Sequence, residues 1–302
     1  MTPALAAVCP DHPQSPSVAT CSRCGRFVCA VCLRSDAPPL CPACAPRVAD
    51  PLGVLSAPFS FGNAVGYGVR MLLPVWGKAL LLSVLFSIPG GWISWLSAPA
   101  DDESLTQVGR SIQRSNIYDA LVGSVGEVAV ILLCIGVAEG RRLSLGQALR
   151  ESLSRYGRLF SARFRSGVWI LAFTLLFVLP GVWKAVLLAF AVPAAVRIEA
   201  MDALKLSTLL VTPRWWAVFG RVTAVMALFL VPAVLFVGVF DFAVGFLELP
   251  RLPVEVVEDW ATRTAEYLVS ACLLAGFYGL CFDAKVSLEP MAWRTGQRGP
   301  MV

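Results

Sequence analysis

Residues 217–240 read AVFGRVTAVMALFLVPAVLFVGVF, with Arg221 as their single charge. The hydrocarbon core of a bilayer is crossed by about 20 mostly apolar residues of helix. Runs of comparable length lie at about 75–97, 119–139 and 263–282. The whole chain has 302 residues, of which 57% are hydrophobic and 15% charged. This composition predicts a membrane protein and excludes an ordinary soluble enzyme or a disordered scaffold.

A fifth apolar region, residues 167–196, is interrupted by Pro180-Gly181. The preceding loop, 140–166, carries seven arginines against Glu151, and the residues after the region are also net positive. Basic loops stay in the cytoplasm, so both ends of the region are expected there and a hairpin turning at Pro180-Gly181 is predicted. Each arm of about 15 residues reaches only about 22 Å, which keeps a re-entrant hairpin as an alternative to two full crossings.

The loops at 98–118 and 241–262 contain few lysines or arginines, which places them on the opposite side. We therefore predict an all-α multi-pass bundle of six segments over residues 59–284, followed by a tail at 285–302. No secretory signal is visible at the start of the chain. Both termini are expected in the cytoplasm of a bacterial cell, with the bundle in the inner membrane.

Three segments share one order of features and predict a repeated unit of a helix plus a hairpin. Each has an alanine in a short amphipathic stretch, an aromatic residue twelve positions later, an apolar run, and a proline followed by a small residue. The three sets are Ala64, Trp76, Pro89-Gly90; Ala148, Phe160, Pro180-Gly181; and Ala203, Trp215, Pro232-Ala233.

The amphipathic pattern is clearest in the second copy. Ser144 and Gln147 have the spacing of a capping box at its start. Such a helix is expected either in the cytoplasmic interface, with arginines toward anionic headgroups, or packed on the bundle as a connecting helix. Its apolar stripe consists of Leu145, Leu149, Leu153, Tyr156, Phe160 and Phe164.

The stretch Pro180-Gly-Val-Trp-Lys-Ala, with Phe190-Ala-Val-Pro193, Asp202-Ala-Leu-Lys-Leu-Ser207 and Arg214-Trp-Trp-Ala-Val-Phe-Gly220, resembles a known membrane domain. It is similar to the multi-pass domain that accompanies some glycerophosphodiester phosphodiesterases. The resemblance implies a membrane fold of unknown role. It implies no catalytic assignment, because the phosphodiesterase chemistry of that family belongs to a separate soluble domain.

The N-terminal stretch CPDHPQSPSVATCSRCGRFVCAVCLRSDAPPLCPAC, residues 9–44, contains four pairs of potential metal ligands. Two residues separate the members of each pair, which lets both reach one ion, and two pairs complete a tetrahedron. Eight ligands therefore predict two structural Zn²⁺ sites. A disulfide framework is disfavoured, because histidine cannot join one and no route to an oxidising compartment is visible. The pairs are Cys9/His12, Cys21/Cys24, Cys29/Cys32 and Cys41/Cys44.

This segment resembles a B-box-type zinc finger. The resemblance implies a cross-brace, in which the first and third pairs (Cys9, His12, Cys29, Cys32) hold one ion and the second and fourth (Cys21, Cys24, Cys41, Cys44) hold the other. Many B-boxes have histidines in the last pair, where this chain has cysteines. We place the module at residues 1–47 and a linker at 48–58.

Candidate catalytic residues are scarce. No histidine follows His12, and Val122-Gly123-Ser124-Val125-Gly126 lacks the turn sequence of an intramembrane serine protease. We therefore expect no enzymatic activity. Ionisable residues within apolar segments indicate functional positions by default. The notable ones here are Glu127, Lys184 and Asp241, and Glu127 is expected to face the bundle interior near Lys184.

These observations favour a non-enzymatic membrane protein whose cytosolic zinc module recruits a protein partner to the bilayer. The alternative is a transporter or lipid-handling protein regulated by the module. Nucleic-acid binding is disfavoured, because the first 50 residues hold only four arginines and no basic helix follows a Cys/His pair. The partner and the oligomeric state stay open.

Overall fold

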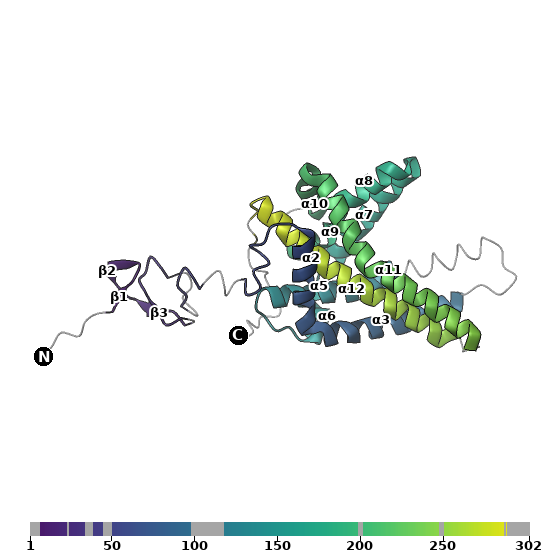
Figure 1. Cartoon of the computed structure of the whole chain (residues 1–302), viewed down its shortest axis with the longest axis horizontal. Coiled ribbons are helices and arrows are strands. Elements are labelled where there is room, and N and C mark those ends of the chain that lie inside the picture. Colours follow the sequence, from purple (N-terminus) through teal and green to yellow (C-terminus); the bar gives the residue numbers. More distant parts are fainter. Residues whose placement is uncertain are drawn as a thin grey trace.

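The computed structural model describes residues 7–22, 24–33, 39–44, 50–97, 118–198, 202–247, 251–286 and 288. Figure 1 shows a small module of short strands and a larger helical part. Most of the loop predicted at 98–118 and of the tail predicted at 285–302 lies outside the described residues.

The N-terminal module consists of two short antiparallel hairpins. Strand β1 (Val8–Cys9) pairs with β2 (His12–Pro16), and β3 (Ala19–Thr20) pairs with β4 (Phe27–Val28). Six of the cysteines, together with Val28 and Leu40, form its buried cluster, which is separate from the core of the helical part. A core this small cannot hold the module together by apolar burial alone.

The larger part of the chain folds into a bundle of helices, as predicted. Six of its helical segments are long and apolar enough to cross a membrane, at Phe61–Ile93, Leu121–Ala138, Tyr156–Leu176, Val178–Arg197, Ala203–Val244 and Val254–Asp283. The chain is therefore a multi-pass membrane protein with a separate Cys/His module. Its helices are α2 (Phe61–Leu72), α3 (Trp76–Ser97), α5 (Ser124–Ala138), α6 (Leu145–Ser154), α7 (Tyr156–Leu176), α8 (Val178–Leu188), α9 (Ala191–Arg197), α10 (Ala203–Val211), α11 (Trp215–Leu247) and α12 (Arg251–Asp283).

Helix α12 runs through the centre of the bundle. It packs against α2, α3, α5 and α11, and most of its surface is buried. By contrast, α7 and α11 leave most of their apolar surface uncovered by protein. Apolar side chains on such surfaces face hydrocarbon in a membrane protein. The bundle therefore has a protein-packed centre around α12 and a lipid-facing periphery on α7 and α11.

The repeat predicted from the sequence is visible as a short helix, a break and a long helix. In the first copy, a 3₁₀ turn at Leu73–Val75 joins α2 to α3, and in the third, a 3₁₀ turn at Thr212–Arg214 joins α10 to α11. The predicted hairpins in these two copies are wrong, because Pro89 and Pro232 lie inside continuous helices. Neighbouring helices in a membrane bundle allow such prolines to be accommodated without ending the helix.

The second copy does form a hairpin, but its turn lies earlier than predicted. Phe177 has extended backbone angles and separates α7 from α8. Pro180 is the third residue of α8, where its missing N–H removes no helical hydrogen bond. The Pro-Gly pair therefore belongs to the first turn of a helix and does not form the turn of the hairpin.

The predicted amphipathic helix of the second copy divides at Arg155 into α6 and α7. The predicted capping box is present: Gln147 N–H donates to Ser144 Oγ, and Ser144 N–H donates to Gln147 Oε1. Helix α6 packs along α5, and Ser152 Oγ donates to the carbonyl of Val125 at 2.9 Å. These contacts favour the second of the two interpretations, a connecting helix packed on the bundle.

Residues of the predicted linker are part of the helical core. The two Asp50 carboxylate oxygens accept hydrogen bonds from the Val54 and Leu55 amides, both at 2.8 Å. Val54 is only 1% exposed and belongs to the main core of the bundle. The described part of this stretch, 50–58, is thus anchored to the helices.

Candidate metal centre

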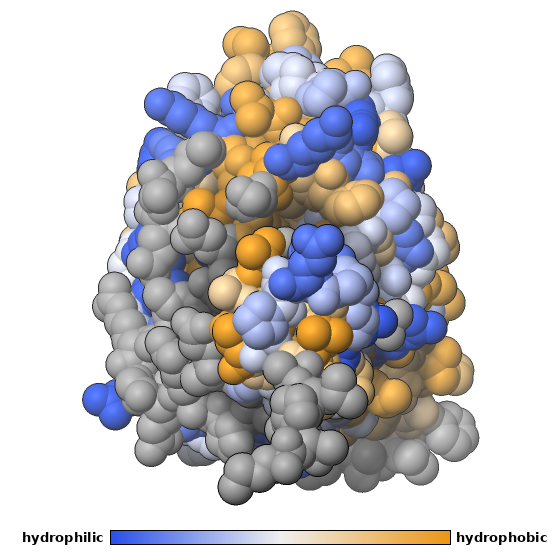
Figure 2. Space-filling model, turned by 90° about the vertical axis from the view of Figure 1, so that its left-hand side faces the viewer, coloured by the Kyte–Doolittle hydropathy of each residue, from blue (hydrophilic) through white to orange (hydrophobic). Residues whose placement is uncertain are grey.

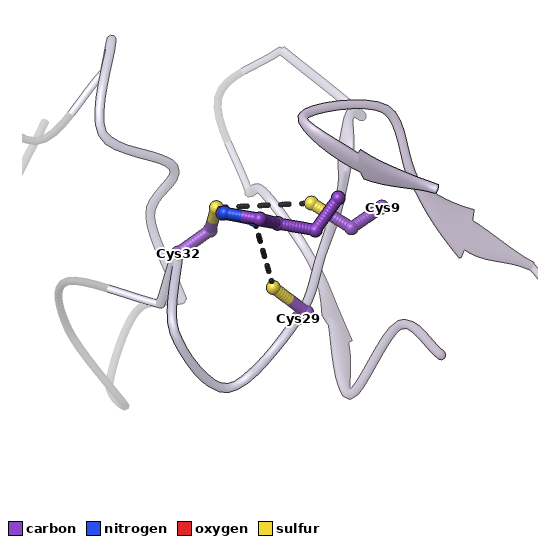
Figure 3. A group of neighbouring side chains, drawn as sticks. Cys9, Cys29 and Cys32 are labelled. Carbon is purple, nitrogen blue, oxygen red and sulfur yellow. Dashed lines mark hydrogen bonds between the residues drawn. The ribbon is translucent and has the colours of Figure 1, made fainter. Parts of the chain in front are cut away.

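The first Cys/His group is built by one hairpin and one loop. The register of β1 and β2 places Cys9 opposite His12. The chain leaves β4 at Cys29, and the Cys32 amide donates to the Cys29 carbonyl at 3.1 Å, which turns both cysteines to one side. Figure 3 shows the side chains of Cys9, Cys29 and Cys32 converging on one point.

Three short contacts define this group. His12 Nδ1 lies 3.2 Å from Cys32 Sγ and 3.5 Å from Cys29 Sγ, and the sulfur atoms of Cys9 and Cys32 are 3.7 Å apart. A tetrahedral ion with Zn–S bonds of about 2.3 Å and a Zn–N bond of about 2.0 Å separates two sulfurs by about 3.8 Å, and sulfur from nitrogen by about 3.5 Å. The group therefore has the dimensions of a tetrahedral zinc shell.

The second group is formed by Cys21, Cys24, Cys41 and Cys44. Gly25 has φ +72° and its amide donates to the Cys21 carbonyl at 2.9 Å, which closes the turn that carries Cys21 and Cys24. Glycine adopts this left-handed backbone without steric cost. The Cys44 amide donates to the Cys41 carbonyl at 3.0 Å in the opposing turn, and Cys24 Sγ lies 3.8 Å from Cys41 Sγ.

Each group can hold one metal ion. Within each, the four ligand atoms all lie within 4.8 Å of one another. The structure thus brings together all eight residues predicted as ligands, the first pair with the third and the second with the fourth. All ten cysteines are free thiols, including Cys134, Cys272 and Cys281 in the bundle.

Two thiols of the module, one in each group, have raised pKa values. Burial and the neighbouring thiols of Cys9 and Cys29 raise the pKa of Cys32 to about 12. A hydrogen bond with Cys41, followed by burial, raises the pKa of Cys44 to about 12. Crowded thiols resist collecting negative charge, and a bound cation removes that penalty, so metal binding releases protons.

Both groups are closed, because four protein atoms fill the tetrahedron in each. A catalytic zinc keeps one position for water or substrate, and a structural zinc does not. The chemistry supported by this donor set is therefore structural.

The intramembrane charges are placed differently from the prediction. Glu127 on α5 pairs with Arg163 of α7 and accepts a hydrogen bond from Ser270 of α12 at 2.8 Å. Lys184 instead lies over the ring of Trp169, 5.5 Å from its centroid. The expected proximity of Glu127 to Lys184 is therefore wrong, because α8 turns Lys184 toward α7.

Two buried ion pairs were missed by sequence reasoning. Arg155 pairs with Glu151 at 2.7 Å within one helix turn, and Arg197 pairs with Glu139 at 3.1 Å between α9 and the end of α5. The i,i+4 spacing signals the first pair. The second joins residues 58 positions apart, for which a single sequence contains no signal. Asp241, the third predicted charge, is exposed on α11.

Comparisons of the chain with protein-family models, with curated proteins and with solved structures find no match.

Proposed function

We propose that this chain is a non-enzymatic membrane protein whose N-terminal module binds two Zn²⁺ ions and docks a protein partner at the bilayer surface. The observation that carries the proposal is the pair of closed four-ligand groups, which have the dimensions of tetrahedral zinc shells. Zinc would supply folding free energy to a module whose apolar core is too small to do so.

Apolar side chains on the module support the docking role. Val31 is 71% exposed between the ligands Cys29 and Cys32, and Val18 and Phe27 are also exposed. A metal shell fixes these residues in place, and exposed apolar residues on a rigid surface are typical of protein contacts. The alternating pairing of ligands is consistent with a B-box-type cross-brace, which we propose as the fold type. We propose the cytoplasm as the compartment of the module, on the basis of the arginine-rich loop at 140–166.

The first test is the metal content of the purified full chain. We expect two zinc ions per chain by inductively coupled plasma mass spectrometry. Cys44→Ser is expected to lower this to one, while Cys281→Ala, which removes a thiol outside the groups, keeps two. A full chain that purifies without zinc and takes none up would contradict the proposal.

The second test separates docking from folding. Val31→Ser keeps all eight ligands and removes an exposed apolar side chain, so it should retain two zinc ions. We expect it to weaken the zinc-dependent co-purification of a partner that the parent chain retains in detergent. A double variant, Val31→Ser with Phe27→Ser, gives the decisive result. If it retains every zinc-dependent partner at the level of the parent chain, this surface is not the docking site.

A transporter or lipid-handling function is the second candidate. It is favoured by the contact of Glu127 with Arg163 and Ser270, which joins three membrane-length helices through polar side chains. The transport function is tested by comparing the parent chain with Glu127→Gln in proteoliposomes. If the variant carries every solute that the parent chain carries at an unchanged flux, transport does not depend on this contact.

A further inference from the structure

We propose that the open pocket between α7, α8 and α10 binds the phosphate headgroup of an anionic phospholipid. The pocket has a volume of about 640 Å³, within the range of about 300–1,000 Å³ usual for small-molecule sites. Its wall combines basic and apolar residues, among them Arg165, Trp169, Lys184, Lys205 and Leu209.

The pocket holds an excess of positive charge. Arg165 is paired with Asp202 at 3.1 Å, so these two charges compensate each other. Lys184 and Lys205 make no salt bridge with any residue in the described parts of the chain. An ammonium group held near hydrocarbon is costly without an anion beside it. Among the described residues, the half-buried Lys184 and the exposed Lys205 therefore leave two positive charges on the pocket without a carboxylate partner, which points to an anionic ligand.

Lys184 is fixed in a position that leaves it able to bind an anion. Its ammonium nitrogen lies 5.5 Å from the ring centroid of Trp169 and 5.6 Å from that of Phe173. These contacts hold the side chain against α7 through the ring faces, which do not accept its N–H groups as an oxygen would. An ammonium group carries three donors, so hydrogen bonds to phosphate oxygens are still possible.

The apolar wall selects a lipid over a free anion. Trp169 is 49% exposed and Leu209 is 67% exposed, and both border the pocket beside the lysines. A free phosphate gains nothing from such surfaces, whereas acyl chains pack on them while the headgroup contacts the cations. Basic pockets between membrane helices are a known form of anionic headgroup site.

The position of the pocket along the hairpin fits the depth of a headgroup. No charged residue occurs between Arg165 and Lys184, so the two cations border a continuous apolar hairpin. Trp215 and Trp216 begin α11 nearby, and Trp215 Nε1 donates to the Trp183 carbonyl at 3.2 Å. Tryptophans concentrate at the boundary between hydrocarbon and headgroups. Figure 2, seen from the side on which the N-terminal module lies, shows apolar side chains at the upper edge of the molecule, where Figure 1 places α8 and α10.

The test compares lipid binding by two double variants of the full chain in nanodiscs or detergent. Lys184→Gln with Lys205→Gln removes both uncompensated charges from the pocket. Arg142→Gln with Arg150→Gln removes two exposed charges elsewhere and serves as the matched control. Binding of phosphatidylglycerol and of phosphatidylcholine is measured by native mass spectrometry.

We expect the parent chain and the control to bind phosphatidylglycerol more tightly than phosphatidylcholine. The pocket variant is expected to lose about 25-fold in affinity for phosphatidylglycerol, since each lysine that contacts the headgroup contributes about fivefold. Lys184→Arg with Lys205→Arg keeps the charges and is expected to bind as the parent does, which separates loss of charge from loss of folding. Equal phosphatidylglycerol affinity in the parent and the pocket variant, or equal losses in the pocket variant and the control, would overturn the proposal.

A further arm distinguishes the lipid from a free anion. Inorganic phosphate is added at increasing concentration to the chain loaded with phosphatidylglycerol. Because the acyl chains contribute to lipid binding, we expect the lipid to stay bound at millimolar phosphate. Displacement of the lipid at that concentration would assign the pocket to a free phosphate and overturn its assignment to a lipid.

Discussion

Cys24 and Cys41 place their sulfur atoms 3.8 Å apart, although they are 17 positions apart in the chain. The two hairpins of the module are short and its buried cluster consists largely of cysteines, so apart from a few hydrogen bonds and the Arg26–Asp11 ion pair its described turns meet through their sulfur atoms. Closing such loops costs conformational entropy that few apolar contacts in the module can offset. We therefore expect bound metal to determine whether the module folds.

Removing the metal should unfold the module and leave the bundle intact. The bundle has its own core around α12, separate from the cysteine cluster. On chelation we expect fast hydrogen exchange at the amides of Cys32 and Cys44 and unchanged protection in α12, measured by mass spectrometry on the full chain. Protection of the module that survives complete zinc removal would show that it folds without metal.

The two metal sites should be lost independently. His12→Ala removes a ligand from the first group and none from the second, so we expect one zinc per chain. His12→Cys retains a ligand atom of a type that zinc accepts and should keep two. A loss of both ions in His12→Ala would mean that the two sites fold as one unit.

The sequence predicted the Cys/His pairs that the structure gathers into two groups, and the membrane-length helices, because both are local patterns. A pair with two intervening residues and an apolar run can each be recognised within a short window. The turn of the hairpin was predicted at Pro180-Gly181 but lies at Phe177. The prediction was wrong because proline is as acceptable in the first turn of a helix as in a loop. The partners of Glu127 and Lys184 were missed because they depend on how α5, α7 and α8 pack, which no local pattern encodes.

Close packing of α2 against α12 should make Gly68 intolerant of a side chain. A Cβ at Gly68 would lie 2.7 Å from the Cα of Cys272, whereas one at Gly66, on the same helix, would meet nothing within 4 Å. We expect Gly68→Ala to destabilise the bundle by about 1–3 kcal/mol through overpacking. Gly66→Ala should be neutral or stabilising by up to about 1 kcal/mol through helix propensity. Thermal unfolding in detergent measures both, and equal effects of the two substitutions would contradict the close approach of α2 and α12.

The ion pair between Arg197 and Glu139 should be sensitive to the loss of either charge. Both side chains are almost fully buried, at 2% and 8% exposure. Glu139→Gln leaves a buried arginine without its counter-charge, which costs about 3–5 kcal/mol. The exposed Glu266 on α12 provides the control, since surface substitutions change stability by about 0.5 kcal/mol or less. Similar unfolding temperatures for Glu139→Gln and Glu266→Gln would show that the pair contributes little.

The hairpin of α7 and α8 should end inside the bilayer. Its tip is entirely apolar, and Leu175 and Leu179 are 79% and 82% exposed. The uncharged arm from Ser166 to Phe177 reaches about 18 Å at 1.5 Å per residue, close to half of the hydrocarbon thickness of about 30 Å.

A tip that crossed fully would expose this apolar turn to water, at a cost that no polar residue in the turn reduces. We therefore expect an azido-phenylalanine introduced in place of Leu179 to be unreactive toward a membrane-impermeant alkyne added to either side of sealed vesicles. The same residue in place of the exposed Arg150 provides the accessible control, reacting from one side only. Labelling at 179 from the side opposite to the control would establish two complete crossings in place of a re-entrant hairpin.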